Sequence, residues 1–471
     1  MQADDITETR TAEPQAPAAA PQIRGARLAL AVLLLINLFN YIDRQVLAAV
    51  VPQLKQSFFS ADAGGGAAFT PLLVWCQRHL GFRPENALVG LLSMAFMVFY
   101  MIGAPVFGRL GERFSRWKLI CVGVVLWSLA SGASGLASTF GALLFTRCFV
   151  GIGEAAYGPI APAVLSDCFP VRIRGRILAW FYMAIPVGSA LGYVIGEQVA
   201  KSGIGPWAAA CLGGRGESWR WAFYLVVPPG LLLGLWTLLL REPARGASDA
   251  MAAGAAAAAP RWRDYLVLLH TPSYVLCTLG MCAMTFAIGG IAFWMPCYLE
   301  GLPGAGGSPT SVFGAITVVS GLIATLLGGI AGDRLRDRFP GSYFLVSGLA
   351  MLAGFPLVLA MLMAPFPWVW VFLFLACFCL FFNTGPTNTI LANVTHPAMR
   401  ASAFALNILL IHALGDVVSP TVIGIVSDRF GLRAAFLVVA AMFVVAGAFW
   451  LAGVRHLALD TAKAPGRRQA E

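Results

Sequence analysis

Residues 108–118 read GRLGERFSRWK, and residues 328–338 read GGIAGDRLRDR. Each stretch follows a long apolar run and contains a glycine, an acid four residues later and then an arginine. The two stretches take equivalent places in the two halves of the chain, as duplicated repeats about an axis along the membrane normal would. A third version, GIVSDRFGLR at 424–433, ends a later apolar run on the opposite side, as an inverted repeat within one half predicts.

The composition indicates an integral membrane protein. Of the 471 residues, 59% are hydrophobic and 11% are charged, whereas soluble domains carry about 25% charged residues. The long continuous apolar runs favour helices over a membrane β-barrel, whose strands alternate in segments of about 10 residues. We therefore predict an all-α membrane protein with twelve spans near 28–50, 87–107, 119–138, 141–165, 177–199, 221–240, 274–299, 311–331, 342–364, 367–392, 401–426 and 433–454.

The order of segments predicts two six-helix bundles. An Ala/Gly-rich, low-complexity stretch after Arg241 separates six spans from six. The polar, acidic start of the chain lacks the short apolar core of a cleavable signal peptide. We expect, in chain order, a disordered cytoplasmic tail, a first bundle, a cytoplasmic linker, a second bundle and a second cytoplasmic tail, at 1–26, 27–240, 241–272, 273–455 and 456–471.

The distribution of basic residues predicts the topology. An even number of spans puts both termini on one side, and the loops on that side hold the excess of Lys and Arg. We expect both termini in the cytoplasm and the protein in a bacterial inner membrane. Basic loops and anionic lipid account for the net charge of +10 without nucleic acid. Cys76 and Cys211 both fall in predicted outer loops, where a disulfide is one alternative and free thiols the other.

Two spans carry most of the ionisable residues within the apolar runs, where each costs at least about 2.5–3.5 kcal/mol. Arg147 and Glu154 lie seven residues apart, and thus on one helical face. Asp43, in the first span, falls near the level of Arg147, so these two residues can form an ion pair, with Glu154 one or two turns deeper. Two interpretations of these three residues are open: a switch that binds and releases a proton, or a permanent ion pair that links two helices.

A second polar group falls in the eleventh span. His412 and Asp416 lie four residues apart on one face, before Ser419 and Pro420. Histidine titrates near neutrality, so His412 is a candidate second proton site or donor to an anionic headgroup. The alternative is a buried imidazole that hydrogen-bonds to Asp416 or to a carbonyl.

The combined motifs resemble those of the major facilitator superfamily and, within it, the Spinster family. They are NYIDR at 40–44, R-x6-E at 147–154, H-x-x-G-D-x-x-S-P at 412–420 and the two repeated loops. The resemblance implies two six-helix bundles around a cavity that opens to either side in turn. It also implies transport of lysophospholipids or sphingosine-1-phosphate-like lipids, with proton coupling in some members and with coupling and headgroup contact at Asp43, Arg147 and Glu154.

The candidate sites follow from these motifs. We expect His412 to border the substrate cavity. The second half offers uncharged polar and aromatic side chains, which suits an amphiphile. The candidate cavity residues are Asn40, Tyr41, Arg44, Tyr157, His412, Asp416, Asn383 and Thr387. The repeated loops are candidate gates, because their acids and arginines can pair with helix ends across the two halves in one state, through Gly108, Glu112, Arg113, Asp333 and Arg334.

The first outer loop, at 60–86, is long and carries the apolar patch FTPLLVWC. It is a candidate lid or lipid-entry element, or else a tolerated insertion.

The competing functions are a carrier of a small drug-like or carboxylate solute and, in another class, a membrane enzyme or receptor. The chain has no phosphate-binding loop for ATP drive and no metal-ligand spacing. We expect a monomeric carrier, not an enzyme, with lipid and bilayer as its partners and protons as its coupling ion, without another cofactor or a metal.

Overall fold

The computed structural model describes residues 25–60, 69–212, 216–244, 262–336, 338–396 and 399–464. Within these ranges, twelve helical segments are long and apolar enough to cross a membrane. They confirm the predicted all-α membrane fold, and each lies within a few residues of a predicted span. Almost all of the first predicted tail and much of the predicted linker lie outside the described residues.

The first half contributes six spans. The fourth of them is divided at Gly158 and Pro159, where the helix gives way to a second, shorter one. In chain order the elements are α1 (Ala26–Ala49), α4 (Glu85–Arg113), α5 (Arg116–Leu136), α6 (Phe140–Tyr157) with α7 (Ile160–Cys168), α8 (Val171–Lys201), and α10 (Trp219–Trp236) with the 3₁₀ turn η2 (Thr237–Leu239).

The second half also contributes six spans, two of which are divided. The elements are α12 (Pro272–Glu300), α13 (Pro309–Arg336), α14 (Ser342–Met363), α15 (Trp368–Phe381) with α16 (Thr384–Asn393), α17 (Arg400–Ile411) with the π turn η4 (His412–Asp416) and α18 (Ser419–Phe430), and α19 (Leu432–Gly453).

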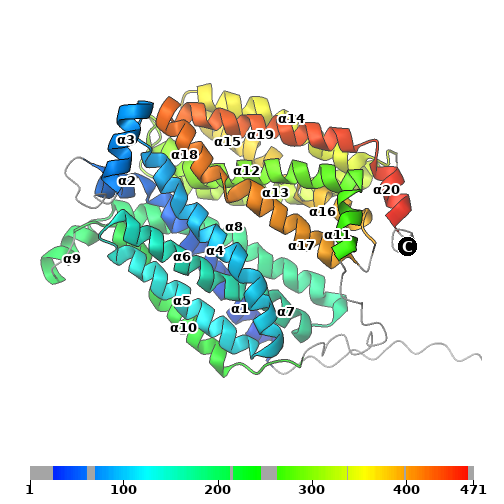
Figure 1. Cartoon of the computed structure of the whole chain (residues 1–471), viewed down its shortest axis with the longest axis horizontal. Helices are drawn as coiled ribbons and strands as arrows, with labels where there is room; N and C mark the ends of the chain where they lie inside the picture. The colour runs from blue at the N-terminus through cyan, green and yellow to red at the C-terminus, as the bar shows by residue number, and fades with distance from the viewer. Residues whose placement is uncertain are drawn as a thin grey trace, which may run out of the picture.

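Figure 1 shows the two halves as separate groups of helices, the first below and the second above. The short helices α2 (Val51–Phe59), α3 (Thr70–Leu80) and α9 (Ile204–Leu212) lie at the left, which we call the α3 end. The short helices α11 (Trp262–Leu269) and α20 (Leu457–Lys463) lie at the right, which we call the α20 end. The halves meet through α4 with α18 and through α8 with α13.

The first repeated motif belongs mainly to a helix end. The sequence places GRLGERFSRWK in a turn, but α4 continues to Arg113 and leaves only Phe114 and Ser115 before α5. In the second half, α13 likewise continues to Arg336. These helices run beyond their apolar residues because charged side chains at a helix end can reach water.

The long loop that the sequence assigns to the outer side contains the helix α3, which holds most of the predicted apolar patch. Leu73 and Cys76 are buried, whereas Leu72, Val74 and Trp75 are exposed. Cys76 and Cys211 are both free thiols, so the structure favours that alternative over a disulfide.

Candidate coupling and substrate site

The ion pair between the first and fourth spans joins Arg44 to Glu154. The Arg44 Nε and Nη2 atoms lie 2.7 and 2.6 Å from the same oxygen, Glu154 Oε2. The Glu154 side chain is fully buried, and that of Arg44 is 18% exposed. Among the described residues no contact within 4.0 Å joins Asp43 to Arg147, although their charges interact at longer range, so the ion pair that the sequence allows does not form in this state. Asp43 and Arg44 are neighbours about 100° apart around α1, and a depth estimate cannot tell which of them meets α6.

Three aromatic rings surround the Arg44 guanidinium. Its Cζ atom lies 4.8 Å from the ring centre of Tyr41, 5.0 Å from that of Phe96 and 5.2 Å from that of Tyr100. Such contacts attract a cation to the ring face. Tyr41 is among the predicted cavity residues, whereas Phe96 and Tyr100 are not, although their four-residue spacing on α4 puts them on one helical face.

Asp43 is held by a different helix. One of its oxygens accepts a hydrogen bond from the Ser131 hydroxyl on α5, and the other, Oδ2, has no partner. The side chain is buried within the first half. Ser131 was also missed, because a serine in an apolar run gives no sign of which carboxylate it meets. Asp43 therefore has one free acceptor, available to a proton.

Arg147 is buried without a carboxylate partner. Its Nε and Nη1 atoms form no hydrogen bond, and its Cζ atom lies 5.7 Å from the ring centre of Phe96. Both arginines thus contact the Phe96 ring, so the group predicted from α1 and α6 does come together. A buried polar atom without a partner costs about 1–3 kcal/mol, and more when it is charged. This cost is relieved in any state that brings an anion or water to Arg147.

Two other candidates from this region are buried. Asn40 lies one turn before Arg44 on α1. The Tyr157 hydroxyl donates to the Leu33 carbonyl at 2.5 Å and ties α6 to α1. This contact gives Tyr157 a structural role in the observed state.

His412 and Asp416 occupy the π turn η4 in the second half. The His412 Nδ1 atom lies 2.9 and 3.0 Å from the two carboxylate oxygens of Asp416. The structure therefore contains the hydrogen bond between His412 and Asp416 that was one of the two alternatives. The side chains are 29% and 22% exposed, so the pair is half-buried. π turns within α-helices are frequent at functional sites.

Asn383 and Thr387 use most of their hydrogen-bonding capacity on carbonyls of their own span, which comprises α15 and α16. The Asn383 Nδ2 atom donates to the Cys379 carbonyl at 2.9 Å, and the Thr387 hydroxyl donates to the Asn383 carbonyl at 2.8 Å. Both residues are buried. The Oδ1 atom of Asn383 has no partner and is the remaining acceptor of this group.

The expected gate residues make few contacts in this state. Gly108 is half-buried, and Glu112, Arg113 and Arg334 are exposed. Among the described residues, Glu112 and Arg113 form no ion pair. Asp333 accepts a hydrogen bond from the Tyr343 hydroxyl at 2.7 Å, within its own half.

Arg116, later in the same motif, forms the contacts at the α20 end. Its guanidinium binds Asp167, lies 3.1 Å from Glu242 and donates to the Pro243 carbonyl at 2.7 Å. Burial opposes the ionisation of Glu242, but hydrogen bonds from Ser115 and Arg116 and the charge of Arg116 hold its pKa below its usual range. Arg116 therefore ties the ends of α5, α7 and η2 together within one half.

At the α3 end, carboxylates from each half cap helices of the other. The two oxygens of Asp428 on α18 accept from the backbone nitrogens of Asn86 and Ala87, each at 2.8 Å, at the start of α4. Glu197 on α8 accepts from the backbone nitrogens of Thr310 and Ser311, at 3.2 and 2.7 Å, at the start of α13.

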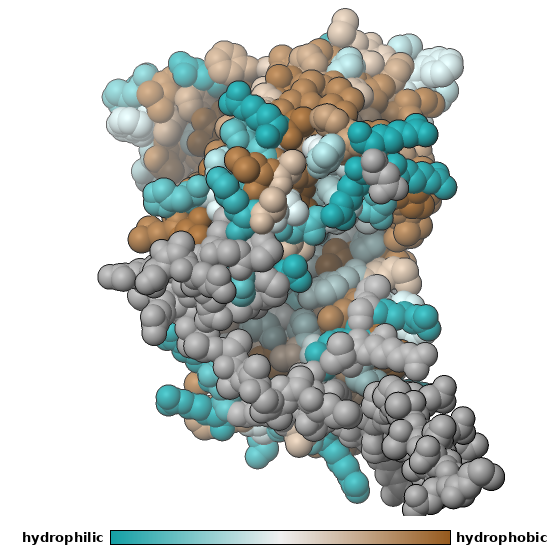
Figure 2. All heavy atoms as spheres, turned by 90° about the vertical axis from the view of Figure 1, so that its right-hand side faces the viewer, coloured by the Kyte–Doolittle hydropathy of each residue, from teal (hydrophilic) through white to brown (hydrophobic). Residues whose placement is uncertain are grey.

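These two caps fasten the halves together at the α3 end, because each bond crosses between them. A carboxylate is favourable at a helix N-terminus, where unpaired N–H groups and the helix dipole meet it. Neither Asp428 nor Glu197 was among the predicted gate residues, although Asp428 is the acid of the third motif and Glu197 is an acid near the end of an apolar span. Figure 2 shows the face at the α20 end hollowed between the two halves.

A family model described as the Major Facilitator Superfamily matches residues 33–420. With the twelve spans, this match defines a multi-pass membrane transporter of a superfamily whose members are typically not enzymes. Protein spinster homolog 3 of Danio rerio is 35% identical over 427 residues, which cover 86% of this chain and 77% of the relative. Protein spinster homolog 1 of Homo sapiens is also 35% identical over 427 residues, which cover 85% of this chain and 73% of the relative. The chain therefore belongs to the Spinster family.

Solved structures agree in fold. The crystal structure of a bacterial homolog to the human lysosomal transporter Spinster, inward-facing and unoccupied, has a TM-score of 0.80 at 21% identity and covers 92% of this chain and 98% of that one. The crystal structure of a D-xylose-proton symporter has a TM-score of 0.70 at 19% identity. The match covers 92% of this chain and 99% of that one. These matches confirm the predicted major facilitator fold.

Proposed function

We propose that this transporter moves an amphipathic lipid with an anionic or zwitterionic headgroup, such as a lysophospholipid or a sphingosine-1-phosphate-like lipid, in exchange or symport with protons. In this proposal both termini are cytoplasmic, the membrane is a bacterial inner membrane, and the working unit is a monomer. Protons are the coupling ion, and neither metal nor nucleic acid takes part.

The observation that carries the proposal is that Asp43 and Arg147 form no ion pair, although their charges interact. Both are buried, and both leave side-chain atoms without hydrogen-bond partners. A carboxylate in this position favours uptake of a proton when the cavity is dry and loss of it when water or a cation arrives. An anionic headgroup that reaches Arg147 would supply the partner that the arginine lacks.

The separation of polar and apolar groups supports a lipid. The charged side chains of α1 and α6 occupy one half, whereas the second-half candidates are the half-exposed pair of His412 and Asp416 and the buried Asn383 and Thr387. A headgroup would lie toward α1 and α6, with the chain along the second half. Acyl chains need apolar walls with few charges.

The two caps at the α3 end support alternating access. Closing one end with bonds between the halves while the other end is hollowed matches one of the two states of such a carrier. Movement to the opposite state would release Asp428 and Glu197 from the helices that they cap.

A carrier of a small organic anion is the second candidate. A compact anion that reached the Arg147 nitrogens without hydrogen-bond partners would supply the missing contact without an acyl chain. A membrane enzyme or receptor is a third class, disfavoured by the transporter family.

Uptake into sealed liposomes tests the proposal. Labelled lysophospholipid is added to liposomes that contain the purified protein, with and without an imposed pH gradient. The proteins compared are wild type, Asp43→Asn and Arg147→Ala. We expect gradient-dependent uptake that both variants lose, and retained uptake in Asn407→Ala, a buried polar control on α17. Equal uptake without a gradient would refute proton coupling. Absence of lipid uptake beside uptake of an organic anion would favour the second candidate.

A further inference from the structure

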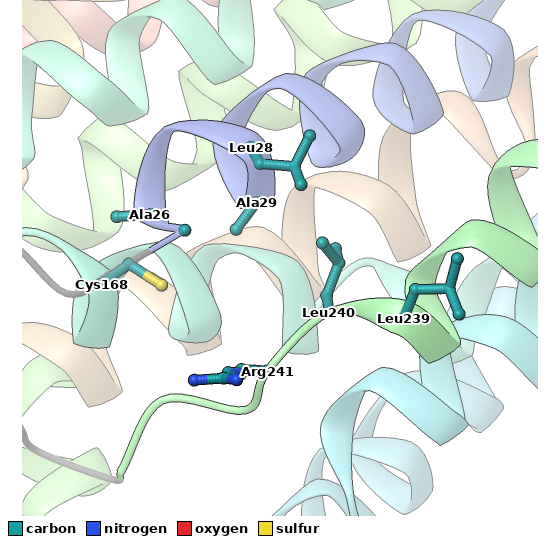
Figure 3. A pocket seen from close by; sticks show the side chains of 8 residues that line it. Ala26, Leu28, Ala29, Cys168, Leu239, Leu240 and Arg241 are labelled. Carbon is teal, nitrogen blue, oxygen red and sulfur yellow. The ribbon is translucent and has the colours of Figure 1, made fainter.

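A separate cavity lies at the α20 end of the first half, between the start of α1, the end of α7 and the end of η2. Its volume is about 330 Å³, within the roughly 300–1,000 Å³ of typical small-ligand sites. Figure 3 shows the side chains that line it, drawn from these three elements. They include Ala26, Leu28, Ala29, Cys168, Leu240 and Arg241.

The cavity lies where the membrane-spanning segments end. Ala26 begins the first span and Leu239 ends the sixth. Leu28 is 44% exposed and Leu239 80% exposed at the rim, which places leucine side chains where acyl chains reach the polar region. A water-soluble ligand would gain little from this rim, whereas a lipid would bury part of its chain against it.

Arg241 supplies a cation with no acidic partner. Figure 3 shows its side chain extending beneath α1 toward the α7 end, where Cys168 lies. Among the described residues its guanidinium forms no ion pair, because the two nearby carboxylates, of Asp167 and Glu242, are held by Arg116. The Arg241 backbone is fixed by its carbonyl, which accepts a hydrogen bond from Trp117 Nε1 at 3.1 Å.

We propose that this cavity binds the phosphate of an anionic phospholipid from the leaflet at the α20 end. Arg241 donates to the phosphate oxygens, and Leu28 and Leu239 contact the first part of an acyl chain. Arginine pairs with phosphate through two parallel hydrogen bonds, and basic pockets between membrane helices hold anionic headgroups in this way. The site is independent of the transported substrate, because it lies at the edge of one half, away from Asp43 and Arg147.

Native mass spectrometry of the purified full chain tests the site. The probes are phosphatidylglycerol and phosphatidylcholine of equal chain length, with inorganic phosphate as a competitor. The variants are Arg241→Gln, which removes the cation, and Ala29→Leu, which fills the cavity. Arg338→Gln removes an exposed arginine at the same end and is the matched control.

Wild type should retain phosphatidylglycerol in preference to phosphatidylcholine. Arg241→Gln should lower that preference about fivefold, the value of one cation near a lipid surface. Ala29→Leu should lower retention of both lipids, and Arg338→Gln should change neither. Equal retention of the two lipids by wild type, or an equal loss in Arg338→Gln, would overturn the proposal. Displacement by millimolar phosphate would also overturn it, in favour of a site for the free anion.

Discussion

Glu154 binds Arg44 across two helices, while Arg147, seven residues before Glu154 on its own helix, has no carboxylate partner. The Arg44 Nη2 atom lies 2.6 Å from Glu154 Oε2, and two Arg147 nitrogens make no hydrogen bond. Arg44 is thus paired with a carboxylate and Arg147 is not, although both guanidinium groups lie close to the Phe96 ring. This asymmetry separates a structural ion pair from a group that can respond to a ligand.

The pair of Arg44 and Glu154 should stabilise the first half. Glu154→Gln should lower the free energy of unfolding by about 3 kcal/mol, because it leaves a largely buried guanidinium without its anion. The double variant Arg44→Gln, Glu154→Gln should recover part of this loss. Thermal unfolding in detergent measures all three proteins. Additive losses in the double variant would show that the two residues do not interact.

The caps at the α3 end should control which end is closed. Asp428→Asn and Glu197→Gln should each weaken closure by about 0.5–2 kcal/mol, the usual value of a helix cap. Spin labels at Arg83 and Arg433, measured by double electron–electron resonance, should report a larger population of molecules in which the two halves are separated at the α3 end. Asp460→Asn is the matched control, since Asp460 caps α12 within one half, 2.9 Å from the Ser273 nitrogen. The same shift in this control would contradict the role of the cross-half caps.

Close backbone contact should be required for the same closure. A Cβ atom added at Gly90 would lie 2.6 Å from the Pro420 carbonyl oxygen, and one at Gly424 would lie 2.5 Å from that of Asn86. Gly90→Val and Gly424→Val should therefore abolish uptake and separate the α3 end. Gly329→Ala, where an added Cβ meets no atom within 4 Å, should keep wild-type uptake. Normal uptake in both valine variants would show that this contact is dispensable.

The Arg116 network should give a small acid dependence of stability. The pKa of Glu242 is below its ordinary value of 4.5, so its contribution is complete above about pH 4.5 and is lost as the pH falls through the lowered pKa. Glu242→Gln should lower the melting temperature at pH 6 and reduce its fall between pH 5 and pH 3. An identical fall in wild type and variant would assign the acid sensitivity to other groups.

The sequence was sufficient for the spans, the two halves and the members of the charged group. Apolar run length sets the first two, and the cost of a charge in a membrane singles out Asp43, Arg147 and Glu154. The partner of each charge could not be predicted, because neighbours such as Asp43 and Arg44 point in different directions around a helix. The third motif singles out Asp428 by its pattern, but only the packing of α18 on α4 shows that this carboxylate caps a helix of the other half.

Contacts that depend on tertiary packing also could not be predicted from the sequence. Ser131, Phe96 and Tyr100 are ordinary residues in apolar runs until α4 and α5 lie against α1. Glu197 resembles a surface acid at the end of a span until α13 begins beside it. The distinction between Arg113, which is exposed, and Arg116, which is buried at 5% exposure, likewise follows from the packing of α7 and η2.

In the proposed mechanism, lipid movement and proton movement are coupled at Asp43. The most direct measurement records the internal pH of proteoliposomes with a trapped fluorescent indicator when lysophospholipid is added without an imposed gradient. We predict a lipid-dependent pH change in wild type, its loss in Asp43→Asn, and its retention in Asn407→Ala. A wild-type protein that moves labelled lysophospholipid without any change in internal pH would contradict the claim.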